Sequence, residues 1–550
     1  MHQGPPVKAF IAAALFATAA PLAAQTAPPA APAPAKPAPK LIVAISVDQF
    51  SADLFQQYRQ HFTGGFARLL NGAVFPSGYQ AHAATETCPG HSTILTGMRP
   101  AHTGIVANNW VDQSVGLEDK IIYCAEDESV PGSTHEAYTV TDKHLKVPTL
   151  GEMMKNADPR ARVVSVAGKD RAAVMMGGHK VDEIWWWDGK TYSSYTGRAV
   201  PPVVQRTRDA VAAMLAQPQA ALPLPGWCKS LDRPITVAGK VYGQGRFERA
   251  AGDLKGFRAS PASDAAVFAM AAGLVQDMKL GQGPQTDIIA VGASATDYIG
   301  HSLGTQGTEM CIQMDELDRS LGGFFDVLDA TGVDYEVVLT ADHGAHDMTE
   351  RQLQRAMPME QHVAPTAQTK QVAAAIAADL KLKGPVLLSA EGDIYVDRDL
   401  PAATRAKVLA EATRRYAAMP QVAAAFPRNQ IAAQAMPTTP PETWTLLERA
   451  RASFDPARSG DLLILLKPRV TTIENPAVGY VETHGSPWDY DRRVPILFWR
   501  KGMAGFEQPL SVETVDIAPT LAATIGLPVH GLDGRCLDLD PGAGTTCPGS

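Results

Sequence analysis

The stretch Leu41-Ile-Val-Ala-Ile-Ser-Val-Asp48 decides how this chain is expected to fold. Its first seven residues are apolar or small and rich in β-branched side chains, which is typical of a parallel strand buried on both faces. Ligands bind at the carboxyl ends of such strands, so Asp48 is either a ligand or a helix cap. The stretch indicates an α/β fold, with a mostly parallel sheet sandwiched by helices.

Further buried-type strands are expected at residues 161–167, 287–291, 336–340 and 494–499. The first ends near two cations, Lys169 and Arg171, which either hold phosphoryl oxygens or line a solvated turn. The second is followed by Asp297 and His301. Because these two residues stand four apart, one helical turn would place both beside a single metal ion.

Two more candidate sites follow strand ends or lie in loops. Asp342 and His343 end the strand at 336–340, and Gly344 would help the chain turn both side chains toward one ion. His484 lies in a polar loop before the strand at 494–499. In the loop at 104–110, either Asn108 or Asn109 could donate an amide hydrogen to an oxyanion, or both could be ordinary turn residues.

The polar segment Thr85-Glu-Thr-Cys-Pro-Gly-His-Ser-Thr93 precedes an expected helix. Pro89 suits the first turn of that helix, which sets Thr87 just before an N-terminus that favours an anion. If a metal lowers the pKa of its hydroxyl, Thr87 is a nucleophile toward a phosphoryl or sulfuryl group. The alternative is that Thr87 only caps the helix.

The composition and the N-terminal sequence limit the classes of protein to which this chain can belong. The 550 residues include 45% apolar and 19% charged side chains, and the net charge of −8 without a dense Lys/Arg run argues against a nucleic-acid partner. Residues 1–24 resemble a secretory signal peptide, and residues 25–40 an Ala/Pro-rich linker. No later run of about 18 apolar residues predicts a transmembrane span. We therefore expect a periplasmic or secreted protein.

The rest of the chain divides into a sheet-based core and an insertion. Residues 41–345 form the first part of the core, with an irregular insertion at about 175–260. Residues 346–455 break the strand–helix pattern and predict a small α+β cap. Residues 456–550 return to the core, starting with a strand at 461–466. The even number of cysteines permits disulfides in an exported chain, and Cys536 is expected to pair with Cys547.

The candidate ligands have a chemistry in common. Three aspartates and three histidines form a mixed oxygen and nitrogen set suited to zinc, with three ligands per ion and Thr87 as a seventh. Two such ions about 4 Å apart can activate a nucleophile and stabilise the leaving oxygen of an in-line displacement. The six are Asp48, Asp297, His301, Asp342, His343 and His484.

The order of these motifs resembles the alkaline phosphatase superfamily. In sequence they are strand-Asp, Thr-x-Thr-x-Pro-Gly-His, Gly-Ile-Val-x-Asn, Gly-Lys-Asp-Arg, Asp-x-x-Gly-His, Ala-Asp-His-Gly and Thr-His-Gly. The chain is most similar to the PafA-type periplasmic alkaline phosphatases, which share a core with the nucleotide pyrophosphatase/phosphodiesterases. The resemblance runs from about residue 41 to residue 540.

The resemblance implies two zinc ions per chain and a role for each site residue. One ion would be held by Asp297, His301 and His484, and the other by Asp48, Asp342, His343 and the Thr87 alkoxide. Thr87 would form a phosphothreonine that water then hydrolyses. Asn108, rather than Asn109, would bind a phosphoryl oxygen. Lys169 and Arg171 match the monoesterase branch, because a phosphate monoester carries nearly two charges that need cationic partners.

The expected substrates are small phosphate monoesters, hydrolysed by a monomer with possible activity toward diesters. Alternatives are a phosphodiesterase on the same core and a non-catalytic metal-binding protein. A sulfatase of the superfamily would need Cys-x-Pro-Ser-Arg where this chain has Cys88-Pro-Gly-His91. A phosphomutase would use serine in the cytosol.

Overall fold

The computed structural model describes residues 1–2, 4, 37–355, 357–542 and 544–547. The expected signal peptide and nearly all of the expected linker lie outside these residues. Everything below concerns the unit of the chain that follows residue 35. Among the described residues, no helix combines the length and the apolar character that a membrane span requires.

Ten strands of the described chain form one large sheet in the order β19-β2-β18-β11-β1-β10-β5-β6-β7, with β20 beside β2. The neighbours from β11 through β6 run parallel, whereas β18 is antiparallel to β11 and β2, and β7 to β6. The expected mostly parallel sheet is confirmed. The strands are β1 Leu41–Val47, β2 Ala73–Tyr79, β5 Val163–Ala167, β6 Glu183–Trp187, β7 Tyr192–Ser193, β10 Asp287–Ala293, β11 Tyr335–Thr340, β18 Arg493–Arg500, β19 Phe506–Glu507 and β20 Val512–Glu513.

Helices cover both faces of this sheet because alternate residues of the central strand β1 point to opposite sides. Val43 and Ile45 join the apolar cluster that includes α9 (Pro261–Asp277) and α11 (Thr308–Ala330). Ile42 and Ala44 join a second cluster, which includes α3 (Thr87–Thr96) and α18 (Ile517–Thr524). All residues of β1 are buried, as its continuous apolar sequence predicts.

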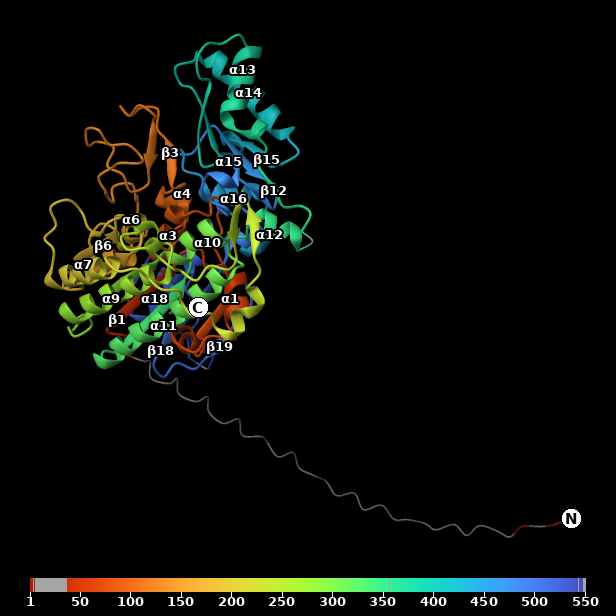
Figure 1. Cartoon of the computed structure of the whole chain (residues 1–550). Helices are drawn as coiled ribbons and strands as arrows, with labels where there is room; N and C mark the ends of the chain where they lie inside the picture. Colours follow the sequence, from red (N-terminus) through yellow and green to blue (C-terminus); the bar gives the residue numbers. More distant parts are fainter. Residues whose placement is uncertain (3, 5–36, 356, 543, 548–550) are drawn as a thin grey trace. The chain divides into compact units, whose positions relative to one another are not determined.

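A smaller antiparallel sheet of order β13-β14-β16-β15 forms the centre of the cap. Its strands are β13 Leu387–Ala390, β14 Asp393–Val396, β15 Val422–Pro427 and β16 Leu462–Leu466. Helices α13 (Thr369–Asp379) and α14 (Ala402–Ala417) pack on it around a separate apolar cluster. Figure 1 shows α13, α14, α15 and β15 gathered at one end, next to α3, α4 and α10.

The prediction that residues 461–466 return to the large sheet is wrong. This segment is β16, which pairs with β14 and β15 in the cap. An apolar run of this length does not reveal which sheet supplies its partners. On one face of β16, Leu462, Ile464 and Leu466 pack in the cluster of the cap helices, and on the other face Leu463 packs against a separate small apolar cluster.

The remaining elements are short and surround the large sheet. The expected helix at 512–522 begins only at α18, after β20 and a 3-10 turn. The other elements are α1 Ala52–Tyr58, α2 Gly65–Leu69, α4 Pro100–Thr103, β3 Asn109–Val111, β4 Ile121–Tyr123, α5 Leu150–Ala157, α6 Asp170–Gly177, α7 Pro202–Leu215, η1 Gly226–Leu231, β8 Ile235–Val237, β9 Lys240–Tyr242, α8 Leu254–Arg258, α10 Ala295–Leu303, α12 Thr349–Gln354, β12 Gln361–His362, η2 Pro365–Ala367, α15 Arg428–Ala433, η3 Pro441–Thr443, α16 Leu446–Ser453, β17 Val470–Thr471, η4 Pro476–Val478, α17 Asp489–Arg492 and η5 Thr514–Asp516.

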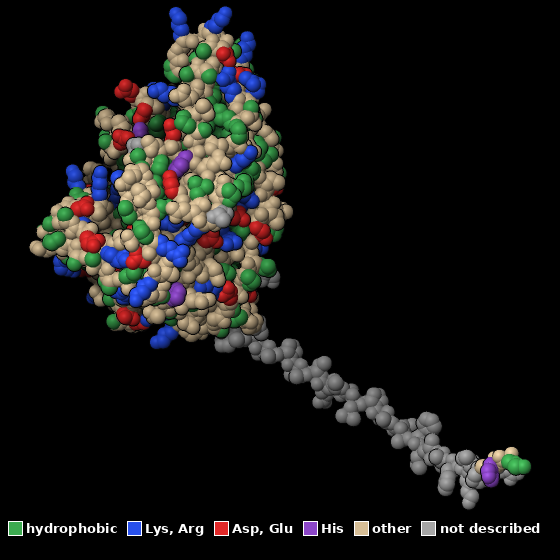
Figure 2. All heavy atoms as spheres, turned by 45° about the vertical axis from the view of Figure 1, so that its right-hand side comes forward, with side chains coloured by type: hydrophobic (Ala, Val, Ile, Leu, Met, Phe, Trp, Pro, Cys, Tyr) green, Lys and Arg blue, Asp and Glu red, His purple; other side chains and the backbone are tan. Residues whose placement is uncertain are grey.

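Three disulfides link these elements and include all six cysteines. The expected pair Cys536–Cys547 is confirmed. Cys88–Cys124 joins the start of α3 to the loop after β4, and Cys228–Cys311 joins the irregular insertion to α11. Acidic and basic side chains are interspersed over the face shown in Figure 2.

Candidate active site

Thr87 is the first residue of α3, a helix whose ten residues are all buried. Its backbone amide therefore belongs to a helix N-terminus, where partial positive charge favours an anion. Gly90 allows α3 to lie directly on the end of β11, because a Cβ there would be 2.0 Å from the carbonyl oxygen of Asp342. The helix thus places Thr87 beside the aspartates that follow the central strands.

The three predicted aspartates follow adjacent strands, β1, β10 and β11, and the three predicted histidines come to meet them. Asp297 Oδ1 lies 3.3 Å from His301 Nε2 and 3.4 Å from His484 Nε2. His343 Nε2 lies 3.2 Å from Asp342 Oδ2 and 3.9 Å from Asp297 Oδ1. The expected helical turn between Asp297 and His301 is confirmed in α10.

Backbone carbonyls fix which nitrogen of each histidine faces the site. Nδ1 of His301 lies 2.9 Å from the backbone oxygen of Glu482, and Nδ1 of His343 lies 3.0 Å from that of Gly344. Nδ1 of His484 lies 2.8 Å from the backbone oxygen of Thr85. A carbonyl oxygen accepts, so each Nδ1 carries the hydrogen and each Nε2 keeps a lone pair. Histidine ligands of metals are held in this way.

Several buried atoms at this point make no hydrogen bond of normal geometry to the described residues: Asp48 Oδ1 and Oδ2, Asp342 Oδ2, His91 Nε2 and His343 Nε2. Carboxylate oxygens and imidazole nitrogens gathered in a dry site are costly unless a cation or a bound proton compensates the carboxylates. Two groups, Asp297/His343/His484 and Asp48/His91/Asp342, each have ligand atoms within 4.8 Å of one another. The residues therefore fit a pair of cations, and their oxygen and nitrogen donors suit zinc.

His91 belongs to this cluster, although the sequence analysis did not single it out. Its Nε2 lies 3.3 Å from Asp48 Oδ1, and its Nδ1 lies 3.2 Å from Asp342 Oδ2 and 2.9 Å from the Thr87 carbonyl oxygen. Burial lowers the pKa of His91, but Asp342 and Asp48 outweigh burial and raise this pKa to about 10. The signal in the sequence was its position four residues after Thr87, one helical turn along.

Lys169 lies inside the cluster, bound to two of its carboxylates. Its Nζ is 2.6 Å from Asp297 Oδ2, 2.9 Å from Asp48 Oδ2 and 3.5 Å from Thr87 Oγ1. Burial lowers the pKa of Lys169, but the two aspartates raise it above the usual lysine value. The side chain therefore remains an ammonium beside the Thr87 hydroxyl, and its carboxylate partners limit its freedom to grip a substrate.

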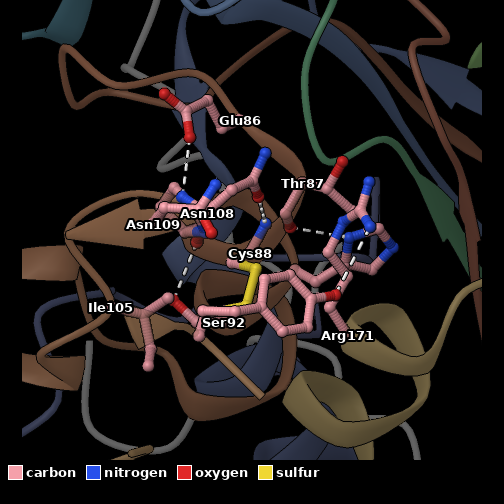
Figure 3. Close-up of a disulfide and its surroundings, with 12 residues drawn as sticks. Glu86, Thr87, Cys88, Ser92, Ile105, Asn108, Asn109 and Arg171 are labelled. Carbon is pink, nitrogen blue, oxygen red and sulfur yellow. Dashed lines mark hydrogen bonds between the residues drawn. A yellow bond between two sulfur atoms is a disulfide. The ribbon is translucent and has the colours of Figure 1, made fainter. Parts of the chain in front are cut away.

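Asn108 and Arg171 lie around Thr87, as Figure 3 shows. Asn108 Oδ1 accepts a hydrogen bond from the Cys88 amide at 2.8 Å, which leaves its Nδ2 hydrogens for another acceptor. Asn109 instead donates its side-chain amide to Glu391 in the cap at 3.0 Å. In this view Thr87 and Cys88 lie between Asn108 and Arg171.

A cavity of about 530 Å³ opens between this cluster and the cap. Its floor includes Thr87, Asn108 and Arg171, and its cap side includes Leu463 and Leu465 of β16. Arg171 is the one Lys or Arg among the described residues that line it. A phosphoryl group on Thr87 would thus meet this guanidinium, with room for an organic group toward the cap.

Comparison with known proteins agrees with this geometry. Residues 42–487 match the family model of type I phosphodiesterase / nucleotide pyrophosphatase. The chain is 58% identical to alkaline phosphatase PhoK of Sphingomonas sp, over 99% of this chain and 100% of PhoK. It is 47% identical to alkaline phosphatase PhoD of Zymomonas mobilis, over 92% and 89% of the two chains.

The fold also matches a solved structure. The crystal structure of alkaline phosphatase PafA superposes with a TM-score of 0.78, over 92% of this chain and 99% of that one, at 24% identity. At this identity the likeness shows the fold alone. The expected alkaline phosphatase-like fold is confirmed.

Proposed function

This chain belongs to the type I phosphodiesterase / nucleotide pyrophosphatase family, and we propose that it is an exported alkaline phosphatase that hydrolyses phosphate monoesters. One observation carries the proposal: Thr87 at a helix N-terminus lies between a carboxylate–imidazole cluster and an available guanidinium. Two relatives named alkaline phosphatase, at 58% identity over 99% of this chain and 47% over 92%, support the same activity.

The proposed cofactor is a pair of zinc ions held by the residues inferred from the sequence. Asp297, His301 and His484 would hold one, and Asp48, Asp342, His343 and Thr87 the other. When bound, the ions would supply positive charge to the attacking and leaving oxygens of an in-line displacement. For the second ion, support comes from buried atoms of Asp48, Asp342 and His343 that make no hydrogen bond of normal geometry among the described residues. For the first ion, support comes from Asp297 and His484, whose ligand atoms lie within 4.8 Å of each other.

The chain's own groups account for nucleophile and substrate orientation. Thr87 Oγ1 would attack phosphorus as the bond to the leaving alcohol breaks, which produces a phosphothreonine that water then hydrolyses. The Lys169 ammonium, 3.5 Å from Thr87 Oγ1, favours the deprotonated hydroxyl. Asn108 Nδ2 and the Arg171 guanidinium would bind the non-bridging oxygens, where charge is concentrated in a monoester.

Arg171 distinguishes this proposal from a phosphodiesterase on the same fold. A diester carries one charge and a second organic group, so it gains less from a guanidinium at this place. The test compares kcat/KM for p-nitrophenyl phosphate and bis-p-nitrophenyl phosphate with zinc-loaded protein at alkaline pH. We expect a large preference for the monoester. A preference for the diester would overturn the monoesterase assignment.

A second test addresses the nucleophile. Thr87→Ala should retain two zinc ions per chain, measured by elemental analysis, and lose nearly all turnover. Substantial remaining phosphatase activity would exclude the phosphothreonine route. A protein that only binds metal would behave the same with and without Thr87.

Export is supported by two features. The apolar run at residues 9–20 follows Lys8, in the manner of a signal peptide. All six cysteines are paired, as in proteins of oxidising compartments. Detection of the mature protein in a periplasmic or culture fraction, with an N-terminus after residue 24, tests this part of the proposal.

A further inference from the structure

The Arg171 guanidinium makes few hydrogen bonds to the protein. Among the described residues, its hydrogen bond is the one that Nη1 donates to the Tyr123 hydroxyl at 3.4 Å. Its Nε is buried without a hydrogen-bond partner in the same part of the chain. Lys169, in contrast, contacts two carboxylates. Tyr123 therefore supplies the hydrogen bond that can orient the Arg171 guanidinium.

We propose that Tyr123 is a positioning residue that holds Arg171 against the phosphoryl group and thereby sets the preference for monoesters over diesters. This inference rests on the proposed function. Tyr123 does not line the substrate cavity, so its effect would be exerted through Arg171.

Asp170 in turn holds the Tyr123 hydroxyl by a hydrogen bond. This hydroxyl donates to Asp170 Oδ1 at 2.8 Å, and the Tyr138 hydroxyl donates to Asp170 Oδ2 at 2.8 Å. The two tyrosine rings pack with centroids 4.6 Å apart. Burial first, and then Asp170, raise the pKa of Tyr123 well above its usual value. The hydroxyl thus stays protonated at alkaline pH, where it can donate to Asp170 and accept from Arg171.

The backbone ties Tyr123 to the nucleophile as well. Its neighbour Cys124 forms the disulfide with Cys88, which follows Thr87 in α3. The Cys124 amide also donates to the Asn108 carbonyl oxygen at 2.9 Å. The segment at Tyr123–Cys124 therefore links the three groups proposed to contact the phosphoryl group, which are Thr87, Asn108 and Arg171 (Figure 3).

Removal of the hydroxyl should affect the two substrate classes differently. Without its acceptor, the Arg171 guanidinium is free to rotate toward solvent in the cavity. A monoester then loses the charged hydrogen bonds that neutralise its second negative charge. A diester has no such charge to lose, so its turnover should barely change.

The experiment measures full-length, zinc-loaded Tyr123→Phe beside the matched control Tyr138→Phe. The control removes a hydroxyl that donates to the same Asp170 but, among the described residues, makes no hydrogen bond to Arg171. For Tyr123→Phe we expect about a tenfold loss of kcat/KM on p-nitrophenyl phosphate and less than a twofold change on bis-p-nitrophenyl phosphate. Inhibition by orthophosphate should weaken by about tenfold. For Tyr138→Phe all three should stay within twofold.

Equal losses on both substrates, or equal effects of the two variants, would overturn the inference. A double-mutant cycle adds a second test, because Tyr123→Phe should have no further effect in an Arg171→Ala background. An additional loss there would show that Tyr123 acts by another route. Wild-type protein without monoesterase activity would refute the proposed function itself. Calorimetry of orthophosphate binding would then still decide whether Tyr123 positions Arg171.

Discussion

Replacing both Cys88 and Cys124 with alanine removes the disulfide that lies beside Thr87. The cysteines are 36 residues apart, and the loss of loop-closure entropy predicts about 4 kcal/mol of destabilisation. Cys228 and Cys311 are 83 residues apart, and the same relation predicts about 4.5 kcal/mol for their removal. By stability alone, the Cys228/Cys311 pair should therefore matter slightly more.

Activity should follow the opposite order. The Cys88–Cys124 bond holds the start of α3 against the segment that carries Tyr123 and contacts Asn108, so its loss lets the nucleophile and the phosphate-binding groups drift apart. A displacement of about 1 Å in such a site costs roughly 100-fold in rate. Cys228–Cys311 joins the irregular insertion to α11 and lies outside the cavity lining, so its removal should leave kcat/KM within twofold.

The assay combines guanidinium unfolding with initial rates on p-nitrophenyl phosphate at 25 °C, where all three proteins must first be shown to be folded. Both double variants should lose stability by similar amounts. Only Cys88→Ala/Cys124→Ala should lose most of its turnover. If this variant keeps wild-type kcat/KM while losing the expected stability, the disulfide does not position the site, and the reasoning is refuted.

Three further predictions concern single side chains. Arg171→Ala should reduce kcat/KM on p-nitrophenyl phosphate at least 100-fold and on the bis ester far less, so equal losses would deny it a role in discrimination. His91→Ala should weaken zinc binding by about 10–100-fold in competition with a chelator, and unchanged affinity would place His91 outside the metal site. Burial, reinforced by Arg492, lowers the pKa of His82 to about 3. Since this folded-state pKa lies below the unfolded value of about 6.5, stability is full above pH 6.5 and falls as the pH drops. Between pH 6.5 and 4.5 the wild type should lose about 2 kcal/mol more than His82→Gln in urea unfolding, and parallel losses would contradict the pKa shift.

The chemistry-bearing residues could be found in the sequence because each follows a recognisable local pattern. Asp48 and Asp342 follow apolar strands, and Asp297 and His301 are spaced by one helical turn. Thr87 was expected just before a helix that starts near a proline, and it is the first residue of that helix. Strand periodicity depends on near neighbours in the chain, and so does a helical spacing. The sequence by itself therefore determined the α/β class, the mostly parallel sheet and the residues available for a metal site.

Only the tertiary structure decided how those residues are arranged. His91 enters the cluster because Gly90 lets α3 approach Asp342, a contact between segments about 250 residues apart. Lys169 forms ion pairs with carboxylates of the cluster. Tyr123 reaches Arg171 because the Cys88–Cys124 disulfide and the pairing of β3 with β4 hold the segment that carries Tyr123 close to α3. The strand at 462–466 likewise joined the cap because of contacts with segments distant in the sequence. Its apolar residues favour burial, but burial has no direction, and only the partners that close over a segment determine which sheet it completes.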